Sequence, residues 1–125
     1  MPASETGESS PFPPAATRLQ AQHNLTQILT QLQTLAPGAK VRLLGLYNPF
    51  DVQPGDAPAA RAQLRVWNDM IESAAVPFDN VVVVPVADLF AARGDLLAGD
   101  RYHPGPKGHE VIADRLLATL PESAP

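Results

Sequence analysis

The segment 99–110 holds the residues whose types and spacing are best suited to chemistry, and it reads Gly-Asp-Arg-Tyr-His-Pro-Gly-Pro-Lys-Gly-His-Glu. Asp100 stands three residues before His103, a separation at which a turn can bring the carboxylate onto the Nδ1–H of the imidazole. That contact fixes the ring tautomer and leaves Nε2 as a general base, which is the supporting half of a nucleophilic triad. Because Pro104 keeps the residue before it out of the α region, we expect His103 to lie outside the helix that begins near Pro106.

Two other chemistries are weaker for this segment. His109 falls inside the last predicted helix, where a hydrogen bond to the preceding loop is the expected role, so we interpret it as structural. A metal site made of Asp100, His103 and His109 lacks a further well-placed ligand, so no metal or other cofactor is predicted. The chain has no cysteine, which excludes disulfides, thiolate zinc sites and cysteine nucleophiles.

Apolar periodicity predicts three helices. The first covers 17–36, where apolar residues recur at helical spacing before Pro-Gly ends the pattern, and these residues are Leu25, Ile28, Leu29, Leu32 and Leu35. The second covers 58–75 and starts at Pro58, whose missing N–H is tolerated in a first helical turn. The last starts near Pro106 and carries apolar residues as far as Leu120.

Two short apolar runs predict strands at 41–47 and 81–86, the second opening with four consecutive valines. A β-branched run without alternation is typical of a parallel strand that is covered on both faces. Strands separated by a helix imply a right-handed parallel crossover, so the fold class is α/β. We therefore predict adjacent parallel strands against which the helices at 17–36 and 58–75 pack, with 87–103 as a long connection.

Length and composition limit the domain organisation. The chain has 125 residues, which is room for one modest domain. Residues 1–16 hold four of the 14 prolines together with several Ser and Glu, so we expect them to be disordered. The domain then covers 17–120, and 121–125 form a short tail.

Charge and hydropathy argue against several partner classes. A formal charge of −4 and a pI near 5.2 disfavour nucleic acid and anionic lipid. No apolar run approaches the ~18 residues that a membrane span needs, and no signal-peptide pattern opens the sequence. As written, the chain is expected to be soluble and unexported, although a longer form could be exported, and the compartment is unassigned.

The segment around His103 resembles the last sequence block of the SGNH (GDSL-type) esterase and lipase family, in Asp-x-x-His-Pro followed by Gly108-His109 at the head of a C-terminal helix. The run Gly-Leu-Tyr-Asn-Pro-Phe at 45–50 is similar to the end of the penultimate strand of bacterial members. The resemblance covers roughly 17–120. It implies a three-layer α/β/α, flavodoxin-like fold with parallel strands, an ester or acyl substrate, His103 as general base and Asp100 as its orienting acid.

The sequence departs from the family pattern toward its N-terminus. The Gly-Asp-Ser block that supplies the nucleophile is absent, and so are the blocks that supply a Gly and an Asn to the oxyanion hole. Ser9 follows Gly7-Glu8, but no apolar strand precedes it and prolines follow it, so we interpret the match as coincidence. Asn48 does not correspond to the family's oxyanion asparagine, which belongs upstream of the first helix. We therefore expect a partial SGNH fold with its N-terminal half missing.

Two functions are compatible with these observations. The first is a carboxylic ester hydrolase, inactive alone and active when another chain or a longer form supplies the missing half. The second is a non-catalytic remnant or interaction module in which the exposed strand edge at 41–47 pairs with a partner. In either case the isolated chain is expected to be marginally stable, self-associating or partly molten, because a half-fold leaves apolar surface uncovered.

The remaining large and basic residues have default interpretations. Tyr47, Phe50 and Trp67 are expected in the core or on a cleft wall, and one of them is a candidate for lining an acyl pocket. The scattered arginines are expected on a solvated surface, and they are Arg18, Arg42, Arg61, Arg65 and Arg115.

Overall fold

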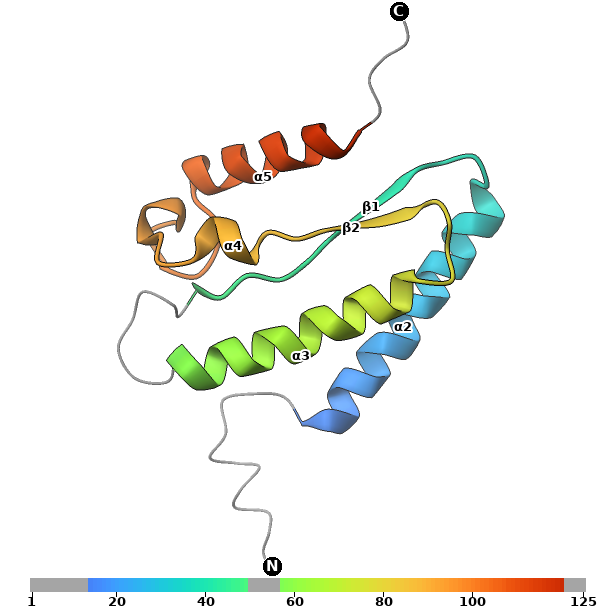
Figure 1. Ribbon diagram of the computed structural model, residues 1–125, viewed down its shortest axis with the longest axis horizontal. Coiled ribbons are helices and arrows are strands. Elements are labelled where there is room, and N and C mark those ends of the chain that lie inside the picture. Colours follow the sequence, from blue (N-terminus) through green and yellow to red (C-terminus); the bar gives the residue numbers. More distant parts are fainter. Residues whose placement is uncertain (1–13, 50–56, 121–125) are drawn as a thin grey trace, which may run out of the picture.

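A two-stranded parallel sheet separates two layers of helix (Figure 1). The computed structural model describes residues 14–49 and 57–120. In chain order its elements are helix α2 (Ala15–Leu35), strand β1 (Val41–Leu44), helix α3 (Ala57–Ala75), strand β2 (Val81–Val84), helix α4 (Ala87–Phe90), the 3-10 helix η2 (Gly94–Leu96) and helix α5 (Pro106–Thr119). Helix α3 packs on one side of the sheet and α5 on the other, which is the α/β arrangement predicted.

The two strands are adjacent and parallel, with Val41 opposite Val81 and Leu44 opposite Val84. This confirms the predicted pairing, but both strands are shorter than the predicted 41–47 and 81–86. At the end of β2, Pro85 has no N–H to donate, and Val86 has a ψ of −4°, outside the extended region. The predicted connection after β2 is also more structured than expected, because it contains α4 and η2.

Asn68 of α3 takes the place of a neighbouring strand just beyond the end of β1. Its Oδ1 accepts the N–H of Leu46 at 2.8 Å, and its Nδ2 donates to the Leu46 carbonyl at 3.1 Å. The N–H of Gly45 still bonds to the Val84 carbonyl at 3.0 Å. Successive extended residues direct their backbone groups to opposite edges, so Asn68 lies on the edge of the β1 segment that faces away from β2. A Cβ at Gly45 would lie 3.1 Å from the Asn68 Oδ1, closer than an ordinary contact, so a side chain here would require Asn68 to shift.

Helix α2 packs mainly on α3 rather than on the strands, so the predicted contact of the first helix with the sheet is wrong. It begins at Ala15, which makes the last two residues of the predicted disordered segment helical. The rest of that segment up to residue 13, and the tail 121–125, lie outside the described residues. Only Leu29 of its apolar stripe is buried, while Ile28 and Leu35 are 53% and 81% exposed.

The core lies around the carboxyl end of β2. Val84, Val86, Phe90 and Leu96 are each at most 2% exposed, and α3 adds a buried face made of Ala60, Met70, Ile71, Ala74 and Ala75. By contrast, Val82 is 42% exposed. The prediction that the valine run is covered on both faces is therefore wrong at this residue. The best-packed part of the molecule is therefore the part from which the loop before α5 emerges.

Two arginines that were predicted to be solvated instead fasten α5 to the rest of the fold. Arg42 donates through Nη2 to the Thr119 carbonyl at 2.9 Å, at the C-terminus of α5, where a cation also complements the helix dipole. Arg115 donates through Nη1 to the Pro85 carbonyl at 3.0 Å and to Asp88 at 2.6 Å. The hydrogen bond from Arg115 lowers the pKa of Asp88.

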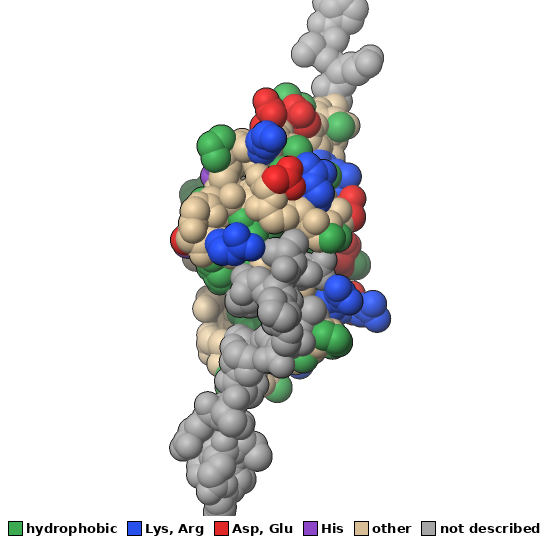
Figure 2. Space-filling model, turned by 90° about the vertical axis from the view of Figure 1, so that its left-hand side faces the viewer, with side chains coloured by type: hydrophobic (Ala, Val, Ile, Leu, Met, Phe, Trp, Pro, Cys, Tyr) green, Lys and Arg blue, Asp and Glu red, His purple; other side chains and the backbone are tan. Residues whose placement is uncertain are grey.

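The surface mixes both charge signs. Figure 2 shows Lys and Arg side chains interspersed with Asp and Glu on the face that it presents. Within residues 14–49 and 57–120, no helix combines the length and the apolar content that a membrane crossing requires.

Candidate active site

The loop between η2 and α5 is a tight, hydrogen-bonded turn. Leu97 and Pro104 form an antiparallel bridge, and inside it the Ala98 N–H donates to the His103 carbonyl at 2.7 Å. The reversal at the tip requires a left-handed residue, which is Arg101 with φ 59°. The loop is thus a short, closed unit that fixes the backbone at His103.

Close approach of α5 to η2 holds this loop in place. The Gly105 N–H donates to the Leu96 carbonyl at 2.8 Å, and Leu96 itself is buried. Any Cβ at Gly108 would clash with that same carbonyl oxygen, so the first turn of α5 can lie this close only with glycine at the position. Packing therefore explains the glycine of the Gly108-His109 pair in the sequence motif.

Asp100 and His103 lie within hydrogen-bonding distance of each other. The Asp100 Oδ2 lies 2.6 Å from the His103 Nδ1. The other carboxylate oxygen, Oδ1, accepts the backbone N–H groups of Tyr102 at 2.9 Å and of His103 at 3.0 Å. The hydrogen bond with His103, followed by these backbone bonds, lowers the pKa of Asp100 to about 2. The carboxylate is therefore ionised at neutral pH and fully engaged.

Asp100 and His103, which we call the dyad, are accessible from solvent. The His103 side chain is 70% exposed and the Asp100 side chain 49%. With Nδ1 engaged by the carboxylate, Nε2 is the ring nitrogen left to exchange a proton with a reacting group. The contact between these two residues was predicted from their separation of three in the chain, and the structure has them at hydrogen-bonding distance.

Tyr47 connects the end of the β1 segment to this loop. Its hydroxyl donates to the Tyr102 carbonyl at 2.6 Å, and its ring stacks on Phe90 with centroids 4.2 Å apart. The Tyr102 ring in turn meets the His103 ring edge-on at 5.0 Å. Burial, and then the nearby charges of Tyr102 and Asp100, raise the pKa of Tyr47, so its phenol remains a hydrogen-bond donor.

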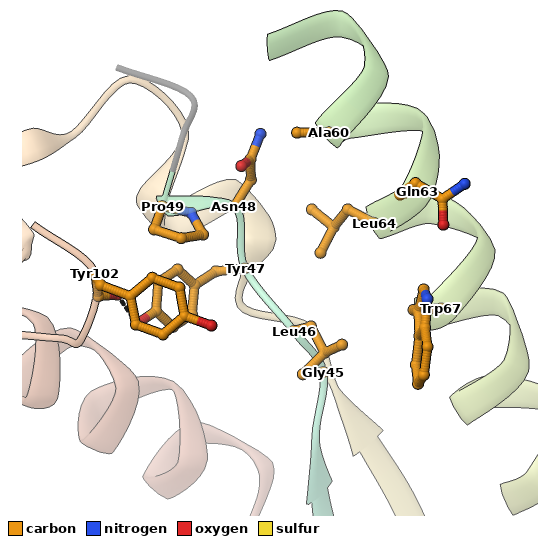
Figure 3. A pocket seen from close by; sticks show the side chains of 10 residues that line it. All are labelled: Gly45, Leu46, Tyr47, Asn48, Pro49, Ala60, Gln63, Leu64, Trp67 and Tyr102. Atoms are coloured by element: carbon orange, nitrogen blue, oxygen red, sulfur yellow. Dashed lines mark hydrogen bonds between the residues drawn. The ribbon is translucent and has the colours of Figure 1, made fainter. Parts of the chain in front are cut away.

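An apolar cavity of about 450 Å³ opens beside the loop (Figure 3). It lies between α3 and residues 45–49, and its lining consists of Gly45, Leu46, Tyr47, Asn48, Pro49, Ala60, Gln63, Leu64, Trp67 and Tyr102. Tyr47 and Trp67 are thus on a cavity wall, as predicted, whereas Phe50 lies outside the described residues. Leu64 and Tyr102 also line the cavity, and no sequence pattern predicted them as wall residues.

A comparison with known families identifies the family of the chain. The sequence profile of the GDSL-like Lipase/Acylhydrolase family matches residues 9–111. The chain belongs to this family. The match covers the sheet, α3 and the dyad loop, and it ends within α5. A search among curated proteins found no sequence match. The GDSL family assignment makes the chain one of an ester-hydrolase kind and fits its α/β fold.

A second cavity, of about 530 Å³, differs from the first in being charged. Its lining includes Arg61, Arg65, Asp69 and Asp88. Asn48 and Leu64 line both cavities. The first cavity is therefore the better match for an uncharged group.

Other candidates from the sequence are not brought to the dyad. The His109 side chain is exposed, and its backbone N–H donates to the Gly105 carbonyl at 2.9 Å, which is the ordinary i to i−4 bond of the first turn of α5. Across the described ranges, no cluster of three or more His, Cys, Asp or Glu is placed to hold a metal ion.

The nucleophile expected in this GDSL family is not among the described residues at the dyad. Ser73 is the only serine of those ranges, and it lies in the last turns of α3. Because α3 runs back against the parallel strands, its C-terminal end lies at the amino end of β2, whereas Tyr47 follows the carboxyl end of β1 (Figure 1). Ser9 falls outside the described residues.

Proposed function

We propose that this chain supplies the general base and its orienting acid to a GDSL-type carboxylic ester hydrolase. The observation that carries the proposal is the 2.6 Å contact between the Asp100 Oδ2 and the His103 Nδ1 on an exposed, hydrogen-bonded loop. In this role His103 Nε2 takes the proton of an attacking serine, and Asp100 stabilises the resulting imidazolium. When the tetrahedral intermediate collapses, His103 passes the same proton to the leaving alcohol.

The serine and the oxyanion donors come, in this proposal, from outside the described residues. A GDSL-type segment on another chain, or in a longer form of this one, is the expected source. Without them, a base and its carboxylate are poor catalysts, since the residual rate of a disabled triad depends on the oxyanion hole. We therefore expect the 125-residue chain alone to hydrolyse 4-nitrophenyl butyrate no faster than free imidazole at the same concentration.

Complementation tests the proposal directly. The chain is mixed with a polypeptide that carries the Gly-Asp-Ser and Gly-x-Asn-Asp blocks, and saturable ester hydrolysis is measured. We expect turnover that falls by about 10⁴-fold in His103→Ala and in Asp100→Asn. His109→Ala is the matched control, because it removes an exposed histidine from the same loop-to-helix region, and it should leave turnover unchanged.

Two results would contradict the proposal. One is equal turnover by the wild-type and His103→Ala complexes. The other is a stable complex without any turnover, which would favour the alternative of a non-catalytic interaction module. Saturable turnover by the chain alone that Ser9→Ala abolishes would instead identify Ser9 as the nucleophile, against our interpretation of that residue.

A further inference from the structure

Helix α2 carries an apolar face that the rest of the described chain leaves uncovered. The helix packs on α3 at the periphery of the molecule (Figure 1), and Leu29 is its one buried residue. Beside Leu29 runs a row of apolar side chains, which we call the α2 seam, and its members are Ala21, Leu25, Ile28, Leu32 and Leu35. The last three are 53%, 40% and 81% exposed. Separations that alternate between four and three residues are typical of a helix that packs along a second helix.

The α2 seam is complementary to a second copy of itself. Arg18 continues the pattern three residues before Ala21, so that from Arg18 to Leu35 the separations are three, four, three, four and three. This order reads the same in both directions, and two copies of α2 that run antiparallel therefore match residue for residue. The opposed pairs are then Arg18 with Leu35, Ala21 with Leu32, and Leu25 with Ile28. The smallest residue of the seam thus meets a leucine, which suits close packing.

The charges of α2 favour this antiparallel arrangement over a parallel one. Arg18 and His23 are the only ionisable residues of the helix, and its last turn contains no basic side chain. A parallel pair would place Arg18 against Arg18 and would align the two helix dipoles. An antiparallel pair instead places Arg18 beside the last turn of the other helix, where a cation complements the exposed carbonyl groups.

We propose that the α2 seam is the interface of a homodimer, in which two copies of α2 pack antiparallel about a two-fold axis that passes between Leu25 and Ile28. A two-fold interface uses the same surface of both copies, which a seam that reads the same in both directions provides. A lipid surface is a poorer occupant, because helices that bind lipid are rich in Lys and Arg and α2 has a single arginine. This dimer is independent of the proposed function, since the seam contains no residue of the dyad loop.

Disulfide cross-linking tests the register of the dimer, because the chain has no cysteine of its own. Ala21→Cys and Leu32→Cys are prepared as separate full chains, mixed, equilibrated under reducing conditions and then oxidised, and the disulfides are identified by mass spectrometry. We expect the mixed disulfide to exceed both self-disulfides several-fold, because the two positions are opposed only in the antiparallel register. Leu32→Cys mixed with Val76→Cys is the control and should show no such preference, since Val76 is 79% exposed but lies outside α2.

Paired variants on α2 test whether the seam supplies the affinity. Leu32→Glu places a carboxylate in the seam, whereas Leu19→Glu makes the same change on the same helix at a residue that is 62% exposed and outside the seam. In sedimentation equilibrium we expect Leu32→Glu to raise the dissociation constant of the dimer at least about tenfold and Leu19→Glu to change it by less than about twofold. Ile28→Glu repeats the test if circular dichroism shows that Leu32→Glu does not fold.

Several outcomes would overturn the homodimer. They are a monomeric wild type, self-disulfides in place of the mixed disulfide, the statistical mixture that random collision gives, and equal weakening by Leu32→Glu and Leu19→Glu. A predominant mixed disulfide, together with dissociation that is confined to the seam variants, would support it. Neither result bears on the hydrolase proposal, because the complementation assay measures ester turnover and these experiments measure only association.

Discussion

The hydroxyl of Tyr47 donates a 2.6 Å hydrogen bond to the carbonyl oxygen of Tyr102, the residue immediately before His103. Tyr47 itself is fixed by stacking on Phe90, which is buried in the core. The His103 imidazole is thus connected through Tyr102 and Tyr47 to the buried core at the carboxyl end of the sheet. The dyad loop is held at its tip by Asp100 and from the side by Tyr47.

Replacement of Tyr47 by phenylalanine should loosen this loop while keeping the aromatic stack. Loss of one neutral hydrogen bond costs about 1 kcal/mol of stability, and the amides of Ala98 and His103 should exchange faster in hydrogen-exchange NMR. Tyr102→Phe is the control, because it leaves the accepting carbonyl intact. Unchanged exchange in Tyr47→Phe, or equal acceleration in both variants, would show that the bond does not hold the loop.

Acid should destabilise the chain partly through Asp100. The pKa of Asp100 in the folded chain is about 2, below its ordinary value of 3.8, so the ionised carboxylate contributes stability that is fully present above about pH 4. That contribution is lost as the pH falls toward 2. Asp95 behaves similarly, since its bond to Arg93 lowers its pKa to about 2.

Urea unfolding between about pH 2 and pH 7 measures this effect. We expect Asp100→Asn to be less stable than wild type at neutral pH and to lose less stability on acidification. Asp79→Asn, in an exposed turn, is the control and should keep the wild-type slope. If the stability of Asp100→Asn falls on acidification as steeply as that of wild type, the Asp100 carboxylate does not stabilise the fold.

Gly108 should be intolerant of a side chain. In Gly108→Ala the new Cβ would clash with the Leu96 carbonyl, so α5 must move away from η2. We expect a net loss of about 1–3 kcal/mol, in spite of the better helix propensity of alanine. Gly99→Ala is the matched control, because nothing lies within 4 Å of its Cβ position. Thermal melts of the two variants give the comparison, and equal melting temperatures would refute the packing argument.

The exposed apolar stripe of α2 should make the isolated chain self-associate. Ile28, Leu32 and Leu35 follow one another at helical spacing and are 53%, 40% and 81% exposed. We expect concentration-dependent association in sedimentation velocity that the double variant Ile28→Gln/Leu35→Gln reduces. Val76→Gln removes an equally exposed but separate apolar residue, 79% exposed, and should leave association unchanged. A strictly monomeric wild type would contradict the prediction.

Local contacts were predictable from the sequence and distant ones were not. The contact of Asp100 with His103 spans three residues and follows from turn geometry and the proline after the histidine. The Tyr47 bond to Tyr102 spans 55 residues, and the Arg42 bond to Thr119 spans 77. Such bonds depend on how the helices and strands pack, and a lone tyrosine or arginine in the sequence does not indicate its partner.

The same limit applies to the helices and strands. The period of apolar residues identified α2 and its stripe, but it could not show that the helix lies on α3 rather than on the sheet. The parallel pairing of β1 and β2 was predictable because a helix separates them in the chain. The ends of the strands were not, since they depend on Asn68, a side chain from another element, and on the backbone at Val86.

The amide of Asn68 also limits how this sheet can grow. Val41 and Gly45 direct their N–H groups to the β2 side, so Arg42 and Leu44 direct theirs to the open edge. A strand arriving there can extend its ladder along these two residues but meets an occupied position at Leu46, whose N–H and carbonyl already bond to Asn68. Asn68 therefore limits the length of any strand that pairs with this edge of β1, because the ladder cannot continue past Leu44.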